Sequence, residues 1–111
     1  MPVSLRTGLE DLTGEMVHAR RNSDLGRLAL LCWCEIRHWA RRAGEERLAH
    51  LSCALITDGP ASDRREFLAR VDQLISELED VCERAGIHAA TRSLELARLD
   101  RSDAQRVSMT H

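Results

Sequence analysis

Apolar side chains in this chain recur at steps of three and four residues, and this spacing limits the possible folds more than any other feature. The clearest run is Leu68, Val71, Ile75, Leu78 and Cys82, which share one face of a helix turning by about 100° per residue. No segment alternates apolar and polar residues with the period of two that a half-buried strand requires. We therefore predict an all-α fold, a small antiparallel bundle of four or five helices.

Glycine, proline and capping residues predict where these helices begin and end. Gly44, Gly59-Pro60 and Gly86 each follow a periodic segment and are typical of helix stops. Thr7 with Glu10, and Asp63 with Glu66, have the spacing of a capping box, and Ser23 is placed to cap a helix that begins at Asp24. We expect one domain over residues 1–99, with a mobile polar tail at 100–111.

The predicted helix over residues 24–43 is the most apolar, and its apolar residues exceed a single stripe. One face carries Leu25, Leu28, Ala29, Cys32, Ile36, Trp39 and Ala43. Leu30, Leu31 and Trp33 fall outside that face, so the helix is either central to the bundle or half buried in a partner. We interpret Trp39 as a core residue. Two interpretations of Trp33 stay open. It contacts a partner protein or a second copy of this chain, or a fifth helix of the same chain covers it.

The overall composition excludes several classes of function. All 16 basic residues are arginine, against 18 acidic residues, so lysine chemistry is excluded and nucleic acid is an unlikely partner. No run approaches the roughly 20 apolar residues of a membrane span, and the N-terminus lacks the pattern of a signal peptide. These features predict a cytoplasmic protein without a membrane partner.

Cysteine and histidine gather in residues 34–53 and raise the alternative of a metal-binding or thiol redox sensor. Cys34 and His38 are four residues apart, and His50 and Cys53 are three apart on the next predicted helix, a donor set that suits zinc. Their combined spacing, C-x3-H-x11-H-x2-C, matches no established zinc motif, and both pairs fall on the polar sides of their helices. We favour no metal and no cofactor, with cysteines that remain thiols.

The tract "RLAHLSCALITDG" is similar, at the level of the fold, to histidine phosphotransfer domains, four-helix bundles with a reactive histidine in mid-helix. That resemblance implies His50 as the reactive residue. The family has a Lys-Gly pair after its histidine, whereas this chain has Leu51, Ser52 and Cys53, so the chemistry does not transfer with the fold.

Charge is unevenly spread along the chain, and one predicted ridge combines it with apolar residues. Residues 20–47 are rich in arginine, whereas residues 72–83 hold five acidic residues and no arginine. Such a pattern indicates either charged faces exposed to solvent or a surface that docks a partner. Leu30, Trp33, Arg37 and Arg41 follow one another at steps of three and four, with the tryptophan as anchor and arginines as rim.

The chain carries no nucleophile elbow, no glycine-rich phosphate loop and no H-E-x-x-H motif. We therefore predict that the protein is not an enzyme. The hypothesis that remains is a small protein-interaction module, a regulator, adaptor or anti-activator, that binds another protein or itself as a homodimer.

Overall fold

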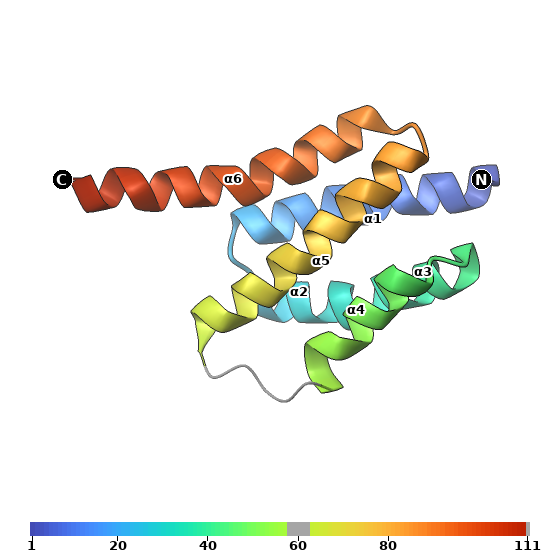
Figure 1. The fold of residues 1–111 in the computed structure, drawn as a ribbon, viewed down its shortest axis with the longest axis horizontal. Helices are drawn as coiled ribbons and strands as arrows, with labels where there is room; N and C mark the ends of the chain where they lie inside the picture. Colours follow the sequence, from blue (N-terminus) through green and yellow to red (C-terminus); the bar gives the residue numbers. More distant parts are fainter. Residues whose placement is uncertain (58–62, 111) are drawn as a thin grey trace.

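The predicted all-α fold is confirmed by a computed structural model, which describes the backbone of residues 1–57 and 63–110 and the side chains of residues 1–55 and 63–99. Within these ranges the chain forms five helices and no strand. Successive helices run in opposite directions (Figure 1). They are α1 (Val3–Arg21), a second helix made of α2 (Leu25–Leu30), η1 (Leu31–Ile36) and α3 (Arg37–Ala43), then α4 (Glu46–Thr57), α5 (Arg64–Arg84) and α6 (His88–Thr110).

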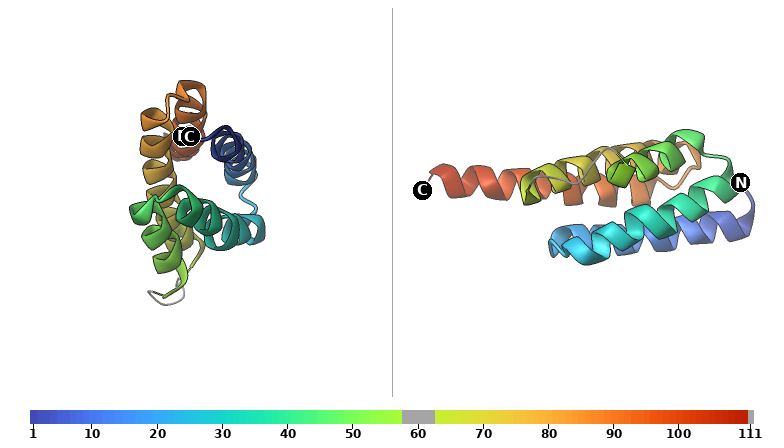
Figure 2. Two further views of the ribbon diagram at one scale, coloured as in Figure 1. Left: turned by 90° about the vertical axis from the view of Figure 1, so that its right-hand side faces the viewer. Right: turned by 90° about the horizontal axis from the view of Figure 1, so that it is seen from below.

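The helices form two layers, with α1 and the α2–η1–α3 helix in one and α4, α5 and α6 in the other (Figure 2). The core lies between these layers, and α5 contributes most to it because its apolar stripe faces neighbours on two sides. The stripe predicted on α5 is buried as expected: Leu68, Val71, Ile75, Leu78 and Cys82, with Leu74 and Val81 beside it. Burial of such a stripe supplies most of the stability of a bundle helix.

Two predicted helix starts are wrong. Helix α1 begins at Val3 with Pro2 as N-cap, because the Arg6 amide already donates to the Pro2 carbonyl, a full turn before Thr7. The cap of the second helix is Asp24, whose carboxylate accepts from the Arg27 amide. The start at Asp63 is confirmed, since its side chain accepts from the Glu66 amide.

Three helices end in the same left-handed turn, and only two of them use glycine. Gly44 and Gly86 have φ of 74° and 78°, and the residue after each donates back across the last turn, Glu45 to Ala40 and Ile87 to Cys82. At the end of α1 the same turn is made by Ser23, with φ of 51°. Its Oγ is buried and makes no hydrogen bond with any described residue. Ser23 therefore carries both a strained backbone and an unpaired hydroxyl.

We expect Ser23→Gly to raise the free energy of unfolding by about 1 kcal/mol, because glycine adopts positive φ without a Cβ clash and removes the unpaired hydroxyl. Urea denaturation followed by circular dichroism measures the effect. Ser23→Ala is the matched control, since it removes the hydroxyl and keeps the strain, and it should gain less. A lower urea midpoint for Ser23→Gly would contradict this account of the turn.

The C-terminal helix passes the boundary that the sequence predicted at residue 99. The backbone of α6 is helical to Thr110, and this end of the helix extends beyond the other helices (Figure 1). The side chains of residues 100–111 lie outside the described residues, and the mobility of this tail stays a prediction.

Candidate functional site

The second helix contains a wider π-helical segment, η1, and the two apolar residues that the sequence singled out lie at or beside it. Leu30 is 57% exposed and Trp33 is 38% exposed, as expected for residues outside the core stripe. Together they are called the Leu30–Trp33 patch below. Trp39 is 5% exposed, and its indole N–H donates to the Leu5 carbonyl at 2.8 Å, which confirms its place in the core.

Leu31, which the sequence placed outside the main stripe, is buried, in agreement with the alternative that this helix is central to the bundle. Its side chain is fully buried. The physical reason is that η1 packs against α1 on one side and α4 on another, so the buried arc is wider than one helical stripe. The Ser52 hydroxyl of α4 donates to the Cys32 carbonyl inside η1. A π turn interrupts the regular backbone ladder, and a side-chain donor of this kind satisfies a carbonyl there.

Arg37 connects the Leu30–Trp33 patch to a neighbouring groove. Its guanidinium carbon lies 5.8 Å from the centroid of the Trp33 ring, within the range of a cation–π contact. Arg37 also lines a groove of about 470 Å³ between α3 and α4, called the α3/α4 groove below. The other residues that line it are Ala40, Arg41, Gly44, Glu46, Ala49, His50 and Cys53.

The groove brings together residues that the sequence had assigned to two different hypotheses. Arg37 and Arg41 came from the predicted protein-binding ridge, and His50 and Cys53 from the candidate metal set. Cys34 and His38 are exposed on the second helix and are not among the residues that line the groove. Among the described residues no three His, Cys, Asp or Glu side chains are placed to hold one metal ion.

None of the four cysteines, all of which are described residues, is in a disulfide, and they lie in three different environments. Cys34 is exposed and Cys53 is half-buried. Cys32 and Cys82 are buried, and burial raises the pKa of the Cys32 thiol to about 12. Burial also raises the pKa of Cys82, although a hydrogen bond with the Thr13 hydroxyl opposes that effect. Both buried thiols therefore stay protonated, and unreactive, at neutral pH.

We expect brief treatment of the native protein with a maleimide at pH 7 to label Cys34 first, because a thiol reacts only where the reagent can reach it. Cys32 and Cys82 should become labelled only when the protein is unfolded in urea. Mass spectrometry of the digested protein locates the label, and Cys34→Ser serves as the control that loses the rapid phase. Rapid labelling of Cys32 in the native protein would contradict the packing of η1.

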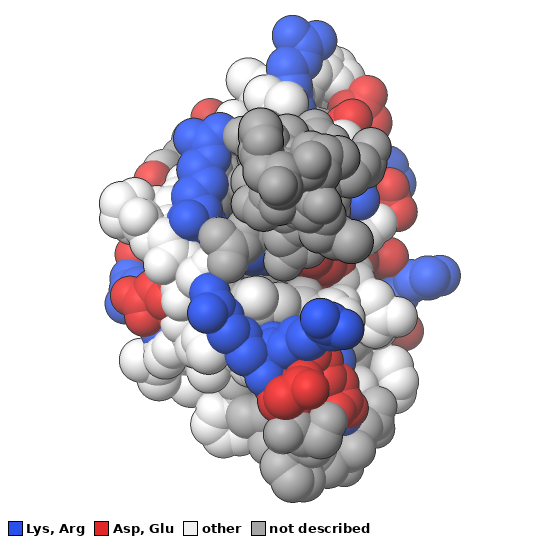
Figure 3. All heavy atoms as spheres, turned by 90° about the vertical axis from the view of Figure 1, so that its left-hand side faces the viewer, with Lys and Arg blue, Asp and Glu red and all other residues white. Residues whose placement is uncertain are grey.

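Six of the fourteen arginines among residues 1–55 and 63–99 form ion pairs with carboxylates. The ion-paired arginines are Arg20, Arg27, Arg47, Arg70, Arg84 and Arg98. Four of the five acidic residues at 72–83 take part in such pairs or bind His88. This acidic segment therefore pairs mainly with basic residues of the same chain. Figure 3 shows basic and acidic side chains interspersed on the face that it views.

The three arginines of α3 are among those that form no such pair. Neither Arg37, Arg41 nor Arg42 forms an ion pair with a carboxylate among residues 1–55 and 63–99. Arg41 and Arg42 are exposed, and Arg37 contacts the Trp33 ring. The positive charge on this helix is therefore open to a partner.

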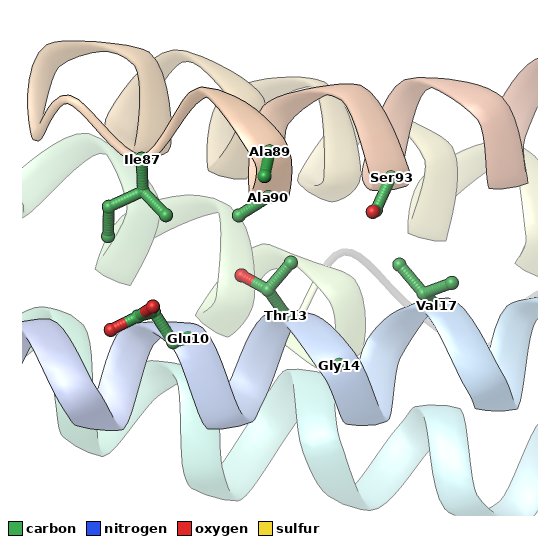
Figure 4. Close-up of a pocket in the computed structure, with 8 residues that line it drawn as sticks. All are labelled: Glu10, Thr13, Gly14, Val17, Ile87, Ala89, Ala90 and Ser93. Atoms are coloured by element: carbon green, nitrogen blue, oxygen red, sulfur yellow. The ribbon is translucent and has the colours of Figure 1, made fainter.

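A second hollow, of about 270 Å³, lies between α1 and the region of α6, and the sequence analysis did not find it. Thr13, Gly14 and Val17 of α1 face Ala90 and Ser93 of α6 across it (Figure 4). Small residues on both helices could have signalled such a gap. Glu10 is the one acidic residue that lines it, and the Thr13 hydroxyl already contacts the Cys82 sulfur at 3.6 Å. This arrangement offers no set of groups for acid–base or nucleophilic chemistry.

His50, which the phosphotransfer resemblance implied as the reactive residue, is exposed on α4 at the α3/α4 groove. A histidine on a bundle helix is compatible with that fold without assigning the chemistry.

Among the helices of the described residues, none combines the length and the apolar character needed to cross a membrane.

Comparison of the chain with profiles of protein families, with curated proteins and with solved structures gives no match.

Proposed function

We propose that this chain is a small cytoplasmic protein-interaction module, a regulator, adaptor or anti-activator, that binds a partner protein through the Leu30–Trp33 patch. Arg37 and Arg41 form the charged rim of this surface. Tryptophan and arginine are the residues that most often dominate the energy of protein interfaces, and such a surface needs no enclosed pocket.

The contrast between the two tryptophans carries this proposal. Trp39 is buried and its indole N–H is hydrogen-bonded, whereas Trp33 lies at the surface beside the exposed Leu30. Trp33 keeps 38% of its surface exposed in the described structure, which supports contact with a partner over cover by another helix of this chain. An exposed indole next to an exposed leucine is an apolar surface that a partner can bury.

We expect Trp33→Ala to leave the helix content unchanged and to abolish capture of the partner protein or self-association. Circular dichroism measures the helix content, and sedimentation together with affinity capture at native expression measures the interaction. Leu96→Ala is the matched control, because Leu96 of α6 is also exposed, at 46%, and lies outside the proposed surface. Equal capture and sedimentation for wild type and Trp33→Ala would contradict the proposal.

A further inference from the structure

The α3/α4 groove is lined by small residues and by side chains that carry positive charge. Ala40, Gly44 and Ala49 are among its lining residues, and a Cβ added to Gly44 would meet no atom within 4 Å. Arg37 and Arg41 line the groove from α3, and Glu46 is the one carboxylate among its lining residues. The groove therefore offers room for the side chains of another helix and an excess of positive charge toward them.

No carboxylate of the described residues neutralises the charge on α3, although Arg37 contacts the Trp33 ring. Six arginines elsewhere bind carboxylates, whereas Arg37 and Arg41 have no carboxylate partner among the described residues. An interface places opposite charges against each other, so an acidic surface suits these two arginines. The whole chain carries a formal net charge of −2, which argues against a nucleic-acid backbone as the ligand.

We infer that the occupant of this surface is an acidic amphipathic helix of a partner protein, with apolar residues on the Leu30–Trp33 patch and two carboxylates on Arg37 and Arg41. The inference rests on the proposed function and adds the chemistry of the partner.

The spacing of the contact residues defines that helix further. Arg37 and Arg41 are four residues apart, which is about 6 Å along a helix axis, so two carboxylates one turn apart can reach both guanidinium groups. Trp33 lies one turn before Arg37, and the 5.8 Å contact between them joins the apolar and basic parts of the surface. The partner helix should therefore present apolar residues followed, or preceded, by two acidic residues at steps of three or four.

A displayed library of 18-residue helical peptides, randomised on one face and selected on the immobilised full-length protein, tests the inference. We expect the selected peptides to be enriched in Asp and Glu at two positions one turn apart, beside apolar residues. Replacing those two acids by Gln or Asn should weaken binding about tenfold in fluorescence anisotropy, since each exposed charge pair contributes a modest share. Selection without a preference for acidic residues would overturn the inference.

Matched variants of the protein locate the contact. Arg37→Gln with Arg41→Gln should lose the same factor of about tenfold toward the acidic peptide and little toward its neutral version. Arg64→Gln with Arg65→Gln removes the same charge from exposed positions on α5 and should bind like wild type. Equal losses for both double variants would contradict a site on α3.

The outcomes also separate this inference from the proposed function. Loss of partner capture in Trp33→Ala, combined with no preference for acidic peptides, would leave the proposed function standing and reject the acidic helix. Normal capture in Trp33→Ala would reject the proposed function itself. If wild type forms a dimer in sedimentation that Arg37→Gln with Arg41→Gln disrupts, the occupant is a second copy of this chain and the inference is wrong.

Discussion

Leu31→Ala is expected to lower the free energy of unfolding by about 3 kcal/mol, the usual cost of truncating a fully buried leucine. Leu31 is buried in η1, a segment that packs against α1 and α4. Truncation removes its apolar contacts and leaves a cavity that the surrounding helices fill only in part. Urea denaturation of the wild type and the variant, at pH 7, measures the difference.

The neighbouring residue provides the control for this prediction. Leu30 is 57% exposed, so Leu30→Ala should change the free energy of unfolding by less than about 0.5 kcal/mol. The two variants differ by one position and remove the same atoms, so their difference reports which way the helix faces in this segment. Equal effects of the two substitutions would show that the helix is rotated relative to the structure described here.

The second large effect is expected at the ion pair between Arg20 of α1 and Asp72 of α5. The guanidinium makes two parallel hydrogen bonds to the carboxylate, at 2.8 and 3.0 Å. The Arg20 side chain is only 4% exposed. Asp72→Ala should therefore cost about 3 kcal/mol, because it leaves a buried charge without a partner. Thermal and urea denaturation measure the loss.

Two comparisons test the explanation for this effect. Replacing both partners, with Arg20→Met and Asp72→Leu, should bring the free energy of unfolding back near that of wild type, since apolar residues of similar size need no counter-charge. Glu15→Ala breaks the exposed pair with Arg27 and should cost less than about 1 kcal/mol. If Asp72→Ala is as mild as Glu15→Ala, burial of the Arg20 charge does not control stability.

Local sequence features predicted a helix well where a single apolar stripe and the capping or stop residues indicate the same boundaries. On α5 the capping residue Asp63, the apolar steps and the stop at Gly86 all indicate the same helix, and the structure contains it. The second helix was harder to predict. A calculation with a fixed turn of 100° per residue has no means of anticipating a π segment, or a helix that packs against neighbours on two sides. The sequence therefore left open whether Leu31 is buried by the bundle or by a partner.

The candidate site was predictable only in part, because it depends on how helices distant in sequence come together. The exposed Leu30 and Trp33 were identified from their position outside the stripe. The α3/α4 groove was not, since it forms between two helices and is lined in part by Ala40 and Ala49, which look unremarkable in the sequence. Arg20 reads as a surface residue until its partner, 52 positions away, is known.

Two ion pairs in which an arginine makes two hydrogen bonds to a carboxylate help to determine the handedness of the bundle, that is, the order of the helices around its axis. Amphipathic helices joined by short turns can be arranged in two mirror-related topologies that bury nearly the same apolar area. Arg20 on α1 meets Asp72, and Arg98 on α6 meets Glu79, so both flanking helices are tied to opposite-charge positions on the central α5. In the mirror arrangement α1 and α6 would lie on the opposite sides of α5. The charged residues of these pairs would then be buried or exposed without their partners. The pairs thus disfavour the wrong winding even where they add little to the stability of the right one.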